Sequence, residues 1–165
     1  MINSAHIHLI LVHLPIVIFP LGTLLLATHQ VKSNETIRNL GCILLVLATA
    51  FAIPAYLTGE GAEELVEEIK GVLESDIENH EDAAVISLWL SCITALVAAS
   101  SFIPRVKSMI KGLPLILITL GTISSLSLFW VGYQGGKIRH PEAYAASSGS
   151  TENGASEEGD RDDDD

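Results

Sequence analysis

Four long runs of apolar residues alternate with polar segments along the chain. The runs contain no Asp, Glu, Lys or Arg, and they cover residues 7–27, 39–57, 83–103 and 113–133. An α-helix rises about 1.5 Å per residue and the hydrocarbon core of a bilayer is about 30 Å thick, so each run suits one crossing. The pattern predicts an all-α integral membrane protein folded as a four-helix bundle.

The polar segment between the second and third runs has a different periodicity. Ten of the 20 acidic residues lie between Glu60 and Asp82, which is too much charge for a lipid environment. Apolar residues recur there three and four positions apart, at Leu65, Val66, Ile69, Val72, Leu73 and Ile77. The spacing predicts an amphipathic surface helix over 62–79, outside the membrane and packed on protein.

The end of the chain, residues 143–165, has no periodic apolar pattern. It consists mostly of small, polar and acidic residues and closes on four consecutive aspartates. Such a composition cannot bury enough apolar surface to order itself. We therefore expect a disordered acidic tail after a four-span membrane domain at residues 1–142.

Composition supports the membrane assignment and excludes other classes. Hydrophobic residues make up 48% of the chain and the mean hydropathy is +0.42, although the formal net charge is −11. The basic surface that nucleic-acid binding requires is absent from the sequence. Cys42 and Cys92 lie in apolar runs, outside any CxxC or CxxCH motif, so we expect inert thiols. Because no Lys or Arg precedes Lys32, we expect a retained first span rather than a cleaved signal peptide.

Charges in the connections between the runs predict the orientation in the membrane. The connection between the second and third runs holds one basic residue, Lys70. The first and third connections hold Lys32, Arg38, Arg105, Lys107 and Lys111. Basic loops stay on the cytoplasmic side, so both termini are predicted to be extracytoplasmic. Lys137 and Arg139, which follow the fourth run, oppose this orientation.

Five of the six histidines fall at one predicted membrane face, where the first and third runs begin and the other two end. This group comprises His6, His8, His13, His80 and His140, and His29 lies at the opposite face. The same end carries the carboxylates of Glu60, Glu63, Glu81 and Glu142. Imidazole is a common ligand for transition metals and haem iron, and a carboxylate can fix its tautomer. The sequence therefore predicts a histidine ligand cluster with these carboxylates as supporting partners.

The stretch HLILVHLP resembles the opening signature of the domain of unknown function 2231 family of bacterial and archaeal membrane proteins. The positions that match are His8, His13 and Pro15, then Gly59 with Glu60, His80, and Gly135 with Gly136. The chain departs from the family pattern at Leu9, where the family has proline, and at the additional His140. The resemblance covers roughly residues 5–141. It implies a protein of the cytoplasmic membrane without a settled activity, and the similarity of some members to fusions with Rieske-type iron–sulfur domains implies membrane redox chemistry.

These observations favour an electron-transfer component that binds b-type haem through two of the five histidines, beside a membrane or periplasmic redox partner. His13 and His80 are the favoured pair, and His29 is expected to be dispensable. The pair differs in depth, because His13 lies within the first run and His80 precedes the third. A third span that begins a turn or more earlier than hydropathy indicates, or a bend of the first helix at Pro15, would remove this mismatch.

Two alternatives stay open. The first is a non-haem site for zinc, copper or iron at the outer face. The second is a structural or assembly subunit whose histidines serve packing and hydrogen bonding. The chain has no phosphate-binding loop, GxSxG motif or Ser-His-Asp pattern, so we expect an electron-transfer or binding subunit rather than a stand-alone enzyme.

Overall fold

The computed structural model describes residues 3–66, 72–140 and 144. Part of the expected surface helix, Glu142 and almost all of the expected acidic tail lie outside these residues. Within them, four long helices are apolar enough to cross a membrane: α1 (Ser4–Lys32), α2 (Glu35–Leu57), α4 (Glu74–Ser100) and α6 (Leu113–Arg139). Two short helices connect them, α3 (Glu60–Val66) and α5 (Pro104–Met109). The all-α prediction with four long apolar helices is confirmed.

A tight turn joins α1 to α2 and makes them antiparallel. Ser33 adopts the left-handed conformation (φ 48°) and its N–H donates to His29 O, which ends α1. The next residue, Asn34, accepts hydrogen bonds from the N–H groups of Thr36 and Ile37 and so caps the start of α2. Polar capping residues thus set the bounds of both helices.

The third crossing begins earlier than its apolar run. α4 starts at Glu74, nine residues before the predicted start at 83, while residues 72 and 73 are not helical. The expected helix over 62–79 is therefore not continuous in the described residues, and its last part belongs to α4. Ile77 supports the extension, because it lies fourteen residues before buried Ser91, about 40° away around the helix, and is itself buried. An ion pair of Asp76 with Lys137 (3.0 Å) also ties the start of α4 to the end of α6.

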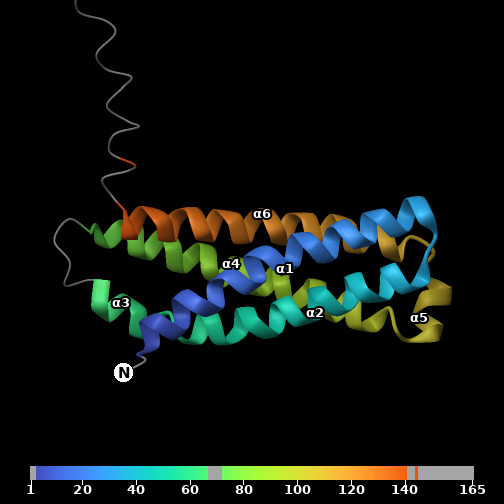
Figure 1. The fold of residues 1–165 in the computed structure, drawn as a ribbon, viewed down its shortest axis with the longest axis horizontal. Coiled ribbons are helices and arrows are strands. Elements are labelled where there is room, and N and C mark those ends of the chain that lie inside the picture. Colours follow the sequence, from blue (N-terminus) through green and yellow to red (C-terminus); the bar gives the residue numbers. More distant parts are fainter. Residues whose placement is uncertain (1–2, 67–71, 141–143, 145–165) are drawn as a thin grey trace, which may run out of the picture.

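The four long helices form a bundle in which each helix packs on one helix from its own half of the chain and on one helix from the other half. α1 packs on α2 and α6, and α4 packs on the same two helices, so α1 and α4 stand diagonally opposite each other. Figure 1 shows the beginning of α1, α3 and the beginning of α4 at one end of the bundle, and α5 with the α1–α2 turn at the other. We name the pairs α1–α2 and α4–α6 the first and second hairpins.

Small and hydroxyl-bearing residues hold the helices close together. Gly22 and Gly41 meet between α1 and α2, where a methyl group on Gly41 would lie 2.9 Å from Gly22 O. In the second hairpin Thr94 Oγ1 and Ser124 Oγ are 3.0 Å apart. Between hairpins, Thr49 Oγ1 donates to Ser91 O (3.1 Å). Close backbone approach and hydrogen bonds of this kind stabilise helix pairs in lipid, where apolar surface alone gives little preference.

Candidate functional site

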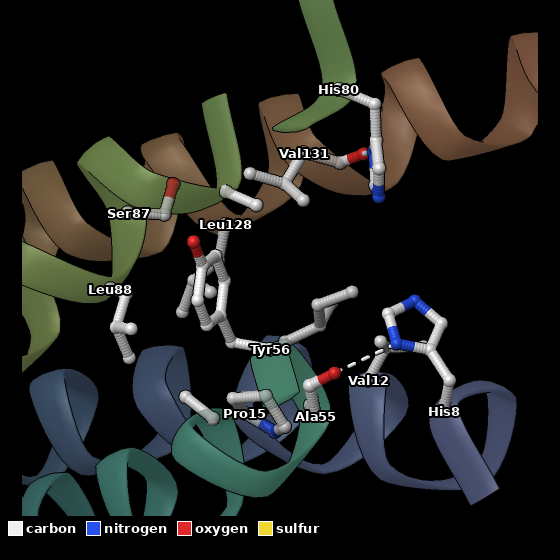
Figure 2. A pocket seen from close by; sticks show the side chains of 13 residues that line it. His8, Val12, Pro15, Ala55, Tyr56, His80, Ser87, Leu88, Leu128 and Val131 are labelled. Atoms are coloured by element: carbon white, nitrogen blue, oxygen red, sulfur yellow. Dashed lines mark hydrogen bonds between the residues drawn. The ribbon is translucent and has the colours of Figure 1, made fainter. Parts of the chain in front are cut away.

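A cavity lies between the two hairpins near the end of the bundle where α1 and α4 begin. All four long helices contribute to its lining, and its volume is about 60 Å³. The walls are mostly alanine and branched aliphatic residues, among which two histidines stand out, His8 from α1 and His80 from α4. Figure 2 shows both imidazoles at the mouth of this cavity, one from each hairpin.

His8 is held by the neighbouring helix of its own hairpin. Its Nδ1 lies 2.8 Å from Ala55 O on α2. A carbonyl oxygen only accepts, so this hydrogen bond requires the proton on Nδ1. The ring also lies beside Gly59, where a methyl group would be 3.6 Å from Cε1 of His8. The neutral ring therefore keeps an unprotonated Nε2.

His80 is held in the same way by the second hairpin. Its Nδ1 lies 3.1 Å from Val131 O on α6, and the same reasoning places the proton on Nδ1. A methyl group on Gly135 would be 3.2 Å from Cε1 of this ring. In Figure 2 the other nitrogen of each ring lies on the side that faces the opposite histidine. Two imidazole lone pairs thus converge on one small apolar space.

The inward direction of His8 follows from its position relative to the buried face of α1. The buried residues of this helix follow His8 by seven, eleven, fourteen and eighteen positions: Pro15, Phe19, Gly22 and Leu26. At about 100° per residue these positions lie within about 40° of His8 around the helix. His13 lies roughly on the opposite side from Leu26, which is why it points outward.

The other predicted ligands do not reach the cavity. His13 is exposed and its Nδ1 bonds Leu9 O of its own helix, and His6 is exposed and bonds the Asn3 side chain. His140 is exposed at the end of α6, and His29 lies at the far end of the bundle, where it bonds Asn34 O. The structure brings together His8 and His80, and it does not bring His13 to His80.

Three of the carboxylates expected to support the histidines, Glu60, Glu63 and Glu81, do not line the cavity, and Glu142 lies outside the described residues. Glu60 and Glu81 are exposed, and Glu63 is half-buried on α3. Main-chain carbonyls of Ala55 and Val131 take the supporting position instead, which no side-chain pattern reveals. Among residues 3–66, 72–140 and 144, no group of three or more His, Cys, Asp or Glu side chains is arranged to hold a metal ion.

Comparison with known proteins agrees with the membrane architecture. No curated protein and no solved structure matches the chain. The model of the family described as "Predicted membrane protein (DUF2231)" matches residues 4–142, which cover all six helices. The resemblance noted in the sequence is confirmed: the chain belongs to the DUF2231 family of predicted membrane proteins.

Proposed function

We propose that this integral membrane protein binds b-type haem between its two hairpins, where His8 and His80 would hold the iron, and serves in electron transfer. The observation that carries the proposal is that both imidazole rings have the same tautomer and the same kind of hydrogen bond. Each Nδ1 donates to a carbonyl of another helix, which leaves each Nε2 free to bind a metal on the side of the cavity. Metal-ligating histidines commonly have their other ring nitrogen fixed in this way.

The number of protein ligands favours haem over a bare ion. The porphyrin supplies four nitrogen ligands, so two imidazoles complete the coordination of its iron. A structural zinc site takes four protein ligands and a catalytic zinc site takes three. Aliphatic residues around the rings, such as Val12, Leu128 and Val131, suit an apolar macrocycle. His8 and His80 would hold the haem, and the haem would supply single-electron chemistry at this site.

The cavity is too small to hold haem in the conformation described here. Its volume is about 60 Å³, whereas cofactor pockets measure roughly 300–1,000 Å³. Haem binding therefore requires the two hairpins to move apart at this end. Small residues on both sides of the gap, Ala52 and Ala55 in the first hairpin and Ala84 and Ser87 in the second, limit the contacts that such a movement breaks.

The small volume also supports a second candidate, a single non-haem ion of zinc, copper or iron between the two imidazoles. Such an ion fits without separation of the hairpins. It would need water or further protein atoms to complete its coordination, because transition-metal sites normally take more than two ligands. This candidate predicts protein without the haem absorption spectrum and with bound metal in proportion to chain.

A comparison of purified variants tests both candidates. Wild-type protein from cells supplied with a haem precursor is expected to contain haem and to show the sharp reduced spectrum of a low-spin cytochrome. His8→Ala and His80→Ala each remove one axial ligand, so we expect loss of haem or a high-spin spectrum. His13→Ala is the matched control, because His13 lies on the same helix as His8 but is exposed.

The outcomes separate the alternatives. Wild-type protein without haem but with bound metal would favour the second candidate, and protein with neither would favour a structural or assembly role. Haem that persists unchanged in both His8→Ala and His80→Ala would contradict the proposed ligand pair.

We also infer an orientation with both termini outside the cytoplasm. The support is the charge distribution: α5 carries Arg105 and Lys107 at the end of the bundle opposite the two histidines, near the α1–α2 turn with Lys32. In this orientation the histidine pair lies near the outer face. A redox partner would then approach from the membrane or the extracytoplasmic side.

A further inference from the structure

The two hairpins repeat the same pattern of buried positions. On α1 buried residues follow His8 by seven, eleven, fourteen and eighteen positions. On α4 residues at the same four distances from His80 are buried: Ser87, Ser91, Thr94 and Ala98. The residue types differ between the hairpins, so the repeat lies in position rather than in sequence identity.

The second helices of the hairpins repeat as well. Buried positions on α2 include Gly41, Leu45, Ala48, Thr49 and Ala52. Buried positions on α6 include Leu117, Gly121, Ser124, Ser125 and Leu128. The intervals between successive members are the same in the two sets. Helix contacts obey the same symmetry, because an exchange of α1 with α4 and of α2 with α6 leaves the pattern of packed pairs unchanged.

The contacts of the two histidines are also repeated between the hairpins. In each hairpin the first helix supplies the imidazole and the second helix supplies a carbonyl. A glycine follows four residues after that carbonyl, in the turn after α2 for the first hairpin and within α6 for the second. The carbonyl and the glycine are Ala55 and Gly59 for His8, and Val131 and Gly135 for His80. We name each carbonyl and glycine pair an imidazole seat.

We propose that the chain is an internal repeat of two hairpins, related by a pseudo-twofold axis along the bundle, and that Gly59 and Gly135 are positioning residues that hold two equivalent imidazoles across that axis. Both hairpins begin at the same end of the bundle, as parallel repeats in a membrane require. That the two imidazoles bind haem rests on the proposed function. The two imidazole seats do not, because they are present in the protein without a ligand.

The seats differ in how closely a side chain at each glycine would approach the ring. A methyl group on Gly59 would lie 3.1 Å from Tyr56 O but 3.6 Å from Cε1 of His8, which is an ordinary van der Waals distance. A methyl group on Gly135 would lie 3.2 Å from Cε1 and 3.5 Å from Nδ1 of His80, so the ring must shift. Because Nδ1 is the atom that bonds Val131 O, a side chain at Gly135 weakens the bond that fixes the tautomer of His80.

Nitrogen NMR of the imidazoles tests the seats directly. Protein without cofactor, labelled with ¹⁵N-histidine, is expected to show His8 and His80 as Nδ1–H tautomers, with each signal assigned through its His→Ala variant. Gly135→Val is expected to move the His80 signals toward a tautomer mixture and to leave the His8 signals in place. Gly132→Val is the matched control on the same helix, α6. A methyl group at Gly132 would meet the end of a flexible side chain, Ile16 Cδ1 at 3.4 Å, and not the ring of His80.

A second pair of variants gives a graded comparison if Gly135→Val fails to fold. Gly135→Ala should shift the His80 signals measurably, and Gly59→Ala should shift the His8 signals less. His80 signals that stay unchanged in Gly135→Ala, or that shift equally in the Gly132 control, would overturn the positioning role.

Haem titration then separates this inference from the proposed function. If haem binds, Gly135→Ala is expected to weaken its affinity by about 10- to 100-fold, as loss of a partner that orients a ligand commonly does. Unchanged haem affinity would overturn the positioning role at the ligand. If wild-type protein binds no haem but the tautomers respond as predicted, the proposed function fails and the two seats stand.

Discussion

At the scale of single residues, what distinguishes His8 and His80 is the partner of Nδ1. His13 and His29 also bond carbonyls through Nδ1, but those carbonyls lie in the same helix or in the adjacent turn. Only a bond to another helix fixes a ring between helices. Among the described histidines, His8 and His80 have such a bond and also line the cavity.

A missing imidazole should be replaceable from solution if it serves as an axial ligand. In His80→Gly we expect a high-spin haem spectrum, because one coordination position opens, and we expect added imidazole to restore the low-spin spectrum. Optical titration with imidazole measures both effects. His13→Gly should be low-spin from the start and insensitive to imidazole. A low-spin spectrum of His80→Gly before any addition would contradict the assignment of this ligand.

At the scale of helices, the first hairpin depends on a backbone contact that tolerates no side chain. A methyl group on Gly41 would meet Gly22 O at 2.9 Å and Leu26 Cγ at 3.0 Å. Main-chain atoms cannot turn aside as a flexible side chain can. The two helices must therefore separate if either glycine gains a larger side chain.

We expect Gly41→Ala to destabilise the protein by about 1–3 kcal/mol, as other additions of volume to packed interiors do. Thermal unfolding in detergent, followed by circular dichroism, measures the change. Gly132→Ala is the matched control, because Gly132 is also within a helix but is exposed, so we expect little change or slight stabilisation. Equal stability of Gly41→Ala and the wild type would show that the hairpin does not need this contact.

The sequence predicted the four long helices but not the pairing of His8 with His80. Helix positions follow from the length of each apolar run, since lipid and protein interior both accept apolar residues. For the same reason, hydropathy does not identify the inward face: Leu9, Ile10 and Val17 are exposed although they are apolar. Which face of α1 points into the bundle depends instead on the contact of Gly22 with α2.

At the scale of the whole molecule, the proposed haem site requires the two hairpins to move apart while each hairpin stays intact. Spin labels at exposed Ile10 and Ile86, on α1 and α4 near the cavity, are expected to move apart when haem is added. Labels at exposed Leu24 and Leu96 report the same two helices farther from the cavity and should keep their distance. Pulsed EPR distances in a background without Cys42 and Cys92 give both values. An unchanged Ile10–Ile86 distance in haem-loaded protein would contradict the separation.

Orientation is a second property of the whole molecule that can be measured. Ser33 lies in the α1–α2 turn and Ser75 near the start of α4, at opposite ends of the bundle, and both are exposed. If both termini are outside, an impermeant thiol reagent should label Ser75→Cys but not Ser33→Cys in intact cells, because short basic loops stay inside. Labelling of Ser33→Cys, without labelling of Ser75→Cys, would indicate the opposite orientation, with both termini in the cytoplasm.

The proposed site would hold one haem iron between two imidazoles, one from each hairpin. The low-temperature EPR spectrum of oxidised wild-type protein is the decisive measurement, because the spin state of ferric haem reports its axial ligands. We expect a low-spin ferric signal typical of two nitrogen axial ligands, without the high-spin signal of five-coordinate or water-ligated haem. A high-spin signal, or a spectrum without haem iron, would rule out a haem iron held by both imidazoles.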